Sequence, residues 1–261
     1  SPEAAVRAVA QGVATVRNRA GSVRLLPGIG IGSPGLVDIH SGRLLSAYDL
    51  GWSHFPLSAE MQRATGLPAL VANRSKVGAL AEYWYSAARN VQDLIYVSVG
   101  TGVAAGIIHN GELYIGTNSS AGELGHTTVD RNGPQCACGN RGCLQTLVSE
   151  RAIEMRAREL LRTDRGSTLH RVAGAYPEQL SAEDIMVAAE ENDPVGMQVV
   201  RECAEYLGIA LGNLANLFNP EEIVLGGPVV TLSPLFVSLT REQTEARALG
   251  HSLRSEEHTS E

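Results

Sequence analysis

Residues 122–143 read GELGHTTVDRNGPQCACGNRGC and concentrate sulfur and imidazole side chains in one short stretch. One histidine and three cysteines follow the spacing H-x9-C-x-C-x4-C: His126, Cys136, Cys138 and Cys143. Zinc prefers four tetrahedral nitrogen and sulfur ligands, and four protein ligands make a closed, structural site. Pro134, Gly139 and Gly142 allow the sharp turns that bring thiolates to about 2.3 Å from one ion. The spacing therefore predicts a structural zinc site, and the alternative is a loop of reduced cysteines without metal.

The remaining cysteine has a different setting. Cys203 lies in an apolar stripe with Tyr206 and Leu207, which is typical of a core thiol. Clustering of the other three cysteines favours a metal over a disulfide framework. The printed sequence contains no signal-peptide or lipidation pattern. We therefore expect reducing conditions and a cytoplasmic location.

Composition limits the class of protein. The chain has 261 residues, 44% of them hydrophobic and 19% charged, with a mean hydropathy of -0.03. These values exclude a disordered chain, and no apolar run approaches the ~20 residues of a membrane span. The net charge of -7 excludes a basic nucleic-acid-binding face on this segment. The 28 glycines are about 11% of the chain, against a typical ~7%, which indicates either backbone-lined ligand loops or many tight turns.

Apolar periodicity predicts alternating helices and strands, and hence an α/β fold. Helix 75–88 is expected to present Val77, Leu80, Ala81, Trp84 and Ala88 on one apolar face, and Asn110-Gly111 predicts a hairpin turn. The predicted helices cover residues 4–20, 58–65, 75–88, 149–162, 181–190 and 194–218, followed by a last helix after residue 228. The predicted strands cover residues 24–32, 36–38, 69–72, 94–99, 104–109, 123–129 and 222–225. A boundary between two lobes is expected near residues 88–93.

At this point the sequence resembles a known family. Glu123-x-Gly125-His126 followed by Cys136-x-Cys138-Gly139-x-x-Gly142-Cys143 is similar to the signature of the ROK family (repressor, open reading frame, kinase). The resemblance extends to residues 30–38 (GIGSPGLVD), 96–106 (YVSVGTGVAAG) and 220–227 (PEEIVLGG). This family comprises bacterial sugar kinases and sugar-responsive transcriptional regulators. It implies a two-lobed actin/hexokinase-like (ribonuclease H-like) ATPase fold, a zinc ion that shapes the sugar-side loop, and a homodimer.

The resemblance also implies a chain truncated at both ends. Residues 1–90 are expected to form a partial first lobe that lacks the first phosphate-loop strands, and residues 91–253 the second lobe with the zinc loop. Regulators of the family carry a helix-turn-helix domain before these strands, and any DNA contact would belong to it. Residues 254–261 are expected to be a non-native tail, or else an ordinary charged one. The single lysine, Lys76, among 21 basic residues indicates a GC-rich genome.

Two glycine turns match the family's nucleotide-binding loops, which we expect to be vestigial here. One follows the strand that ends at residue 99, and the other follows the strand that ends at residue 225; their residues are Gly100, Thr101, Gly102, Gly226 and Gly227. Backbone N–H groups in such turns can approach an anionic phosphate. The alternative for both is a simple structural turn. Ala104 replaces a further glycine that is usual in the family.

The sugar site departs from the family pattern at the catalytic position. ROK kinases carry Asn-Asp where this chain has Asn73-Arg74, and the aspartate accepts the proton of the sugar hydroxyl. A general base must hold a proton reversibly near neutral pH, which an arginine with a pKa above ~12 cannot do. The resemblance assigns sugar binding to Asn73, Glu123, His126 and Gln145, and Gln145 replaces the usual glutamate. Asn73 has the alternative role of a helix cap.

Three hypotheses follow from these residues. The first is the effector-sensing domain of a ROK regulator, inactive as a kinase, which binds a sugar or sugar phosphate. The second is an ATP- and Mg²⁺-dependent, glucokinase-like sugar kinase with a displaced base such as Asp49 or Glu123. The third is a metal-stabilised module without a ligand. None of the three involves a membrane.

Overall fold

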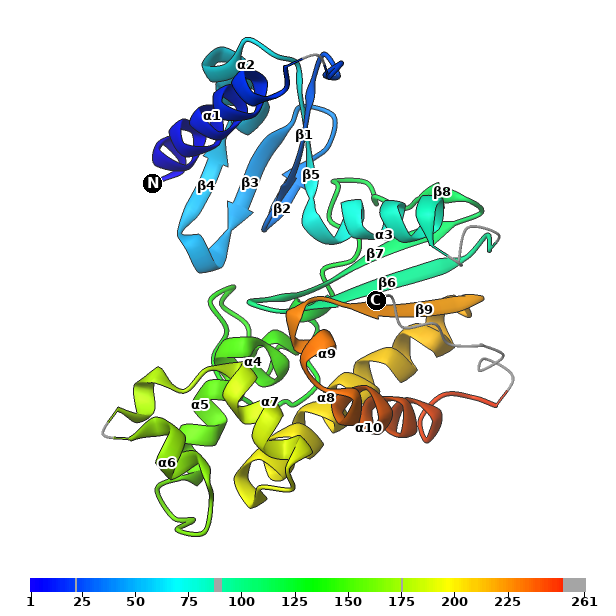
Figure 1. Ribbon diagram of the computed structural model, residues 1–261. Coiled ribbons are helices and arrows are strands. Elements are labelled where there is room, and N and C mark those ends of the chain that lie inside the picture. Colours follow the sequence, from blue (N-terminus) through cyan, green and yellow to red (C-terminus); the bar gives the residue numbers. More distant parts are fainter. Residues whose placement is uncertain (22, 87–90, 175, 251–261) are drawn as a thin grey trace. The chain divides into compact units, whose positions relative to one another are not determined.

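The computed structural model describes residues 1–21, 23–86, 91–174 and 176–250, and its mixed α/β composition agrees with the predicted class (Figure 1). The described chain divides into two compact units. Unit 1 comprises residues 1–78 and 114–121, and unit 2 comprises residues 79–113 and those from 122 onward. The expected tail at 254–261 lies outside the described residues. The expected lobe boundary near residue 90 stays a prediction, because compact units and lobes are different divisions.

The described part of unit 1 contains two small sheets, two whole helices and the first residues of α3 (Arg74–Tyr85), which continues into unit 2. Strand β1 (Ile29–Ser33) pairs in parallel with β5 (Ala69–Asn73), so that Ser33 lies opposite Asn73 at the carboxyl ends of both strands. The antiparallel sheet has the order β2-β3-β4, and α1 packs against α2. Apolar side chains of both sheets and both helices form one core. The bounds are β2 (Leu36–Asp38), β3 (Arg43–Ala47), β4 (Trp52–Phe55), α1 (Pro2–Arg19) and α2 (Leu57–Thr65), with a 3₁₀ turn η1 (Tyr48–Leu50).

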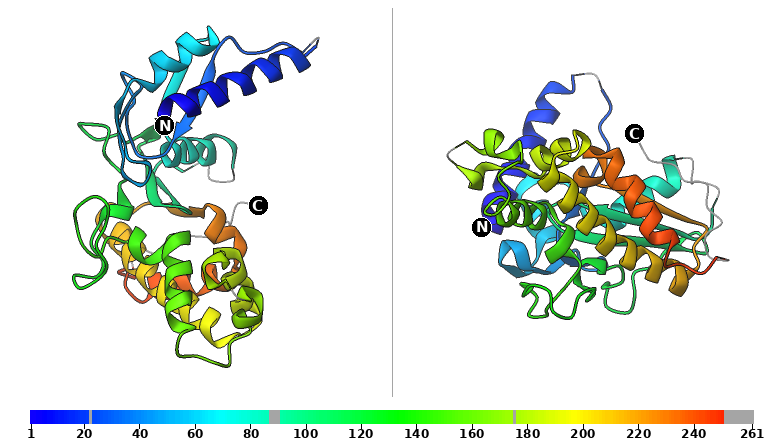
Figure 2. Two further views of the ribbon diagram at one scale, coloured as in Figure 1. Left: turned by 90° about the vertical axis from the view of Figure 1, so that its left-hand side faces the viewer. Right: turned by 90° about the horizontal axis from the view of Figure 1, so that it is seen from below.

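Unit 2 is built on a four-stranded sheet of order β8-β7-β6-β9. The predicted Asn110-Gly111 hairpin is present, with positive φ at both residues, and it joins β7 to β8. Side chains of β6 alternate between two cores: Leu94 meets Ala79 of α3, whereas Ile95 joins the helical core on the other face. Figures 1 and 2 show α8 and α10 covering that second face. The bounds are α3 (Arg74–Tyr85), β6 (Leu94–Val99), β7 (Val103–His109), β8 (Glu112–Leu113) and β9 (Glu222–Gly226).

The helical layer of unit 2 is anchored at the start of its longest helix, α8 (Pro194–Phe218). The buried Asp193 caps this helix by accepting the N–H groups of Val195 and Gly196. Its carboxylate also accepts hydrogen bonds from Ser167 and Thr168, 25 or more residues earlier in the chain. The other elements are α4 (Gln145–Val148), α5 (Glu150–Leu160), α6 (Leu169–Ala173), α7 (Ala182–Glu190), α9 (Pro228–Leu232) and α10 (Pro234–Glu245), with 3₁₀ turns η3 (Leu124–His126) and η4 (Pro177–Gln179).

The structure corrects two of the predicted strands. Residues 123–129 are not a strand: they form η3 and then an extended stretch whose Thr128 bridges Cys143. Their backbone hydrogen bonds go to local turns and to the cysteine loop, with Val129 N–H donating to the Gly142 carbonyl. Residues 24–28 are likewise outside the strand, which begins at Ile29; Pro27 has no N–H to donate to a ladder.

The helix α3 is confirmed, and of its predicted apolar face Leu80 does pack against the core, but Val77, Ala81 and Trp84 are exposed. Val77 is 41% exposed and Trp84 56% exposed, whereas Ala79 and Lys76 are buried. Lys76 donates a hydrogen bond from its ammonium to the Ser119 carbonyl, which explains how a charged side chain occupies the buried side. The expected position Ala88 lies outside the described residues. In the described part of the chain, no helix combines the length and hydropathy needed to cross a bilayer.

Candidate metal centre and ligand site

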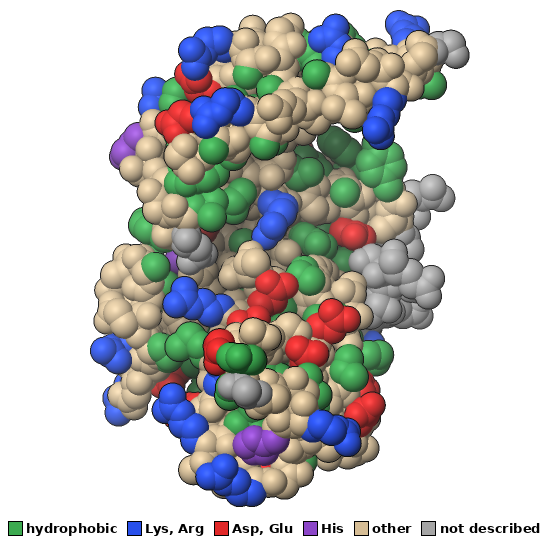
Figure 3. Space-filling model, turned by 60° about the vertical axis from the view of Figure 1, so that its left-hand side comes forward, with side chains coloured by type: hydrophobic (Ala, Val, Ile, Leu, Met, Phe, Trp, Pro, Cys, Tyr) green, Lys and Arg blue, Asp and Glu red, His purple; other side chains and the backbone are tan. Residues whose placement is uncertain are grey.

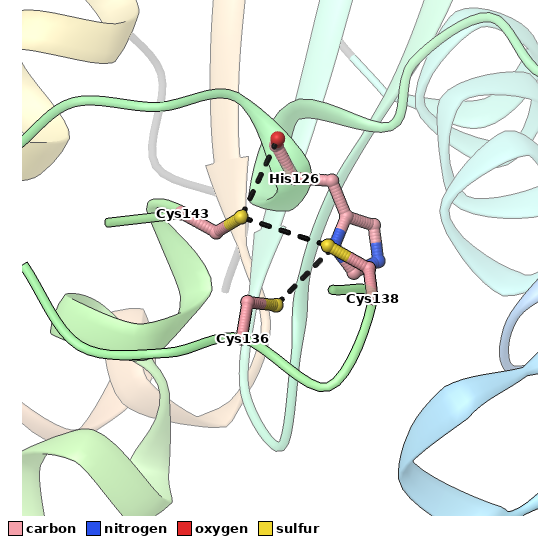
Figure 4. A group of neighbouring side chains, drawn as sticks. All are labelled: His126, Cys136, Cys138 and Cys143. Carbon is pink, nitrogen blue, oxygen red and sulfur yellow. Dashed lines mark hydrogen bonds between the residues drawn. The ribbon is translucent and has the colours of Figure 1, made fainter. Parts of the chain in front are cut away.

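The four predicted metal ligands come together in unit 2. Figure 4 shows the ring of His126, at the end of η3, facing the three thiols of the loop that leads into α4. The Cys136 Sγ lies 3.7 Å from His126 Nδ1, and the Cys138 and Cys143 Sγ atoms are 3.8 Å apart. All four ligand atoms lie within 4.8 Å of one another. Four sulfur ligands around one zinc ion at about 2.3 Å would be about 3.8 Å apart, so the cluster can hold a metal ion.

The loop is shaped by its own backbone. Gly142 has a φ of +65°, and a Cβ there would lie 1.6 Å from the Asp130 carbonyl oxygen, so no other residue fits. Cys136 N–H donates to the Asn140 carbonyl, which closes the turn that carries Cys138. Gln135 braces the same turn, with its amide donating to the carbonyls of Gly139 and Asn140. These bonds shape the turn that carries Cys136 and Cys138.

Metal binding by the cluster depends on the loss of thiol protons. Burial and, to a smaller extent, the neighbouring Cys136 and Cys138 thiols together raise the pKa of Cys143 to about 12. A protonated thiol must lose its proton to become a ligand, and a bound divalent ion compensates the negative charge that results. Burial also raises the pKa of Cys203 to about 12. Its Sγ donates to the Leu147 carbonyl, which agrees with the predicted core thiol.

Asn73 and Arg74 lie at the carboxyl end of the parallel β1–β5 pair in unit 1. The Asn73 side chain, 6% exposed, caps α3 by accepting the N–H groups of Ser75 and Lys76, and its amide donates to the Gly35 carbonyl. The structure thus shows the helix-capping role that was the alternative for this residue. Arg74 is the exposed first residue of α3, directly beside Gly32 of β1.

Three of the predicted sugar-binding residues belong to unit 2: Glu123, His126 and Gln145. Glu123 precedes η3, and the ring of His126 presents Nδ1 to the thiols, so that its Nε2 lies on the far side of the ring. Gln145 is the first residue of α4, and its side-chain amide nitrogen lies 3.8 Å from the Cys136 Sγ. Sequence reasoning missed this contact, because spacing along the chain does not say which neighbour an amide faces.

The two glycine turns assigned to nucleotide binding meet at one edge of the unit 2 sheet. Strands β6 and β9 run parallel, so both turns follow carboxyl ends, where open α/β sheets bind ligands. A Cβ on Gly100 would lie 3.1 Å from the Pro228 ring, and one on Gly227 would lie 2.5 Å from the Val99 carbonyl oxygen. The N–H of Gly100, however, donates to the Gly102 carbonyl inside its own turn. That N–H is therefore already occupied.

A two-unit α/β chain with a His/Cys cluster defines a narrow class, and comparison with known proteins identifies it. The ROK family pattern matches residues 1–258, so the chain belongs to the ROK family. The match reaches into the expected tail at 254–261, whose foreign origin stays a prediction. The fold is the actin/hexokinase-like fold of this family, as predicted.

The relatives include both kinases and repressors. A glucokinase of Halalkalibacterium halodurans is 38% identical over 86% of this chain and 68% of its own length. A xylose repressor of Caldicellulosiruptor bescii is 37% identical over 85% of this chain. The chain spans only 55% of that repressor's length.

The similar solved structures also include both a regulator and a kinase. A ROK family transcriptional regulator, a homologue of the E. coli Mlc protein, has a TM-score of 0.82 at 30% identity over 95% of this chain and 62% of its own. A ROK family glucokinase from Streptomyces griseus, in complex with glucose and AMPPNP, has a TM-score of 0.85 at 29% identity over 97% of this chain and 81% of its own. Overall similarity therefore places the chain in the family without separating regulator from kinase.

Proposed function

We propose that this chain is the effector-sensing part of a ROK-family transcriptional regulator that binds a sugar or sugar phosphate without transferring a phosphoryl group. The observation that carries the proposal is Arg74 at the first position of α3, where the family's kinases carry the catalytic aspartate. A guanidinium keeps its proton at neutral pH and cannot accept one from a sugar hydroxyl. A positioned base contributes typically 10²–10⁴-fold, so its loss nearly silences phosphoryl transfer.

The alternative is a glucokinase-like sugar kinase, favoured by the glucokinase relatives. ATP and Mg²⁺ would then be cofactors, and a displaced carboxylate would have to serve as base. Glu123 is the available candidate, whereas the side chain of Asp49 lies outside the described part of the structure. The regulator is preferred because Arg74 and Gln145 both depart from the kinase pattern, while the sequence keeps all four residues of the metal cluster.

Within the proposed regulator, the cluster holds a structural zinc ion. The family resemblance assigns sugar binding to Asn73 of unit 1 and to Glu123, His126 and Gln145 of unit 2. Asn73 would contribute its second amide N–H, Glu123 its carboxylate, His126 the ring nitrogen on the far side from the cluster, and Gln145 its amide oxygen. Each of these groups can bond a hydroxyl. The turns at residues 100–102 and 226–227 would be remnants of a nucleotide site.

DNA contact would belong to a helix-turn-helix segment outside this chain. On the face drawn in Figure 3, basic side chains are scattered among acidic and uncharged ones and form no continuous basic surface. That distribution and the net charge of -7 support a sensing rather than a DNA-binding role for these residues. A homodimer in the cytoplasm is proposed on the family resemblance.

Isothermal titration with xylose, glucose and glucose 6-phosphate tests the proposal. We expect binding heat with one of these sugars. Glu123→Gln should weaken that binding about tenfold, since a charge-assisted hydrogen bond contributes about 1.5–3 kcal/mol. The exposed Glu112→Gln on β8 is the matched control and should bind as the unmodified chain does. No heat with any sugar contradicts the proposal and favours a metal-stabilised module.

A further inference from the structure

The side chain of Gln145 faces the metal cluster with its nitrogen. Its Nε2 lies 3.8 Å from the Cys136 Sγ, within the range of an N–H···S hydrogen bond. Cys136 is buried, so solvent does not supply the sulfur with a donor. His126 Nδ1, also next to this sulfur, loses its capacity to donate once it ligates an ion.

The backbone around Gln145 reserves the space for this contact. A Cβ on Gly125 would lie 3.2 Å from the Gln145 Oε1, and 2.1 Å from the Val103 carbonyl oxygen. Residue 125 must therefore be glycine, and its missing side chain leaves room for the amide. Gln145 follows Cys143 by two residues, so the start of α4 and the last thiol of the cluster are fixed together.

The charge of the filled cluster explains why an amide suits this position. Three thiolates and a neutral imidazole around a divalent cation carry a net charge of minus one. An amide N–H next to a thiolate stabilises it, because hydrogen bonds to an ionised acceptor are stronger than neutral ones.

We propose that Gln145 is a positioning residue of the metal centre, whose side-chain amide donates a hydrogen bond to the metal-bound thiolate of Cys136. The inference rests on the proposed metal site. It gives Gln145, which stands where the family usually has glutamate, a role at the metal. The Gln145 oxygen remains directed toward Gly125. Loss of such an outer partner typically costs 10–100-fold in metal affinity.

Competition titrations with a chelating indicator and Co²⁺ absorption spectra test the inference on the whole chain. Gln145→Met removes the donor without adding charge, and we expect it to weaken Zn²⁺ and Co²⁺ binding about tenfold. The thiolate-to-cobalt charge-transfer band should also move to longer wavelength, because the thiolate has lost the hydrogen bond that lowers the energy of its lone pairs.

Gln179→Met is the control, since Gln179 is exposed on η4, away from the cluster in sequence, and should leave affinity and spectrum unchanged. Unchanged affinity and an unchanged cobalt spectrum in Gln145→Met overturn the role of Gln145 while leaving the metal site intact. An unmodified chain that binds neither ion overturns the metal site, and the inference with it.

Discussion

Removing the metal with a strong chelator is expected to lower the melting temperature of this chain by about 10 °C or more. Structural zinc binds small peptides with about 10–16 kcal/mol, and this free energy is folding free energy wherever the site does not exist in the unfolded chain. About 1 kcal/mol shifts the melting temperature of a chain this long by about 2–4 °C. The amides of residues 126–143 should be the first to lose protection from hydrogen exchange. Without an ion, three thiols and an imidazole ring must share one small space.

Scanning calorimetry and amide hydrogen exchange, with and without chelator, measure both effects. Cys143→Ser should have a lower melting temperature than the unmodified chain, and chelator should not change it. Cys203→Ser is the matched control, because its thiol lies in the helical core rather than in the cluster, and it should keep the full response. Elemental analysis well below one zinc per chain would falsify the zinc assignment directly.

Asp193→Ala is expected to destabilise the helical layer by about 3 kcal/mol. A lost helix cap costs about 1 kcal/mol, and each lost hydrogen bond to a buried charged group adds about 1.5–3 kcal/mol before relaxation. Ser181→Ala is the control, since Ser181 caps α7 through its side chain without tying in a distant segment. Urea unfolding gives the free energy of unfolding of each variant. The difference between the two losses measures what the hydrogen bonds from Ser167 and Thr168 to Asp193 contribute. Equal losses would contradict that contribution.

The same carboxylate gives a pH dependence of defined sign. Burial tends to raise the pKa of Asp193, but hydrogen bonds from Gly196, Thr168 and Ser167 outweigh it and hold the pKa below its ordinary value. The stabilisation is therefore complete above the ordinary aspartate pKa and is lost as the pH falls through the lowered one. Asp193→Asn should flatten the acid side of the stability profile. A profile that keeps its acid slope in Asp193→Asn contradicts this assignment.

Local chemistry made several features predictable. Sulfur and imidazole spacing was enough to name the four residues that meet in the cluster, because few other arrangements use H-x9-C-x-C-x4-C. Helix α8 begins and ends as predicted, since Asp193-Pro194 is a strong start signal and Asn219 adopts the left-handed conformation that ends it. Asn-Gly at 110–111 marked its hairpin for the same local reason.

Features that depend on distant partners could not be predicted. The apolar pattern of residues 123–129 indicated a strand, but Gly122 and Gly125 press this segment against the carbonyls of β7, and its hydrogen bonds turn toward the cysteine loop. The face of α3 was misassigned because Lys76 has a carbonyl partner on Ser119, 43 residues later. The Gln145–Cys136 contact likewise depends on space left by Gly125.

The most direct test of the central claim is product formation from ATP, Mg²⁺ and each candidate sugar by the full-length protein, followed by mass spectrometry of sugar phosphate. The account predicts no product above the level without protein, under conditions in which calorimetry detects sugar binding. Turnover in the range typical of enzymes, about 1–10³ s⁻¹, that Arg74→Asp leaves nearly unchanged would contradict it, because a displaced base would then be carrying out the chemistry.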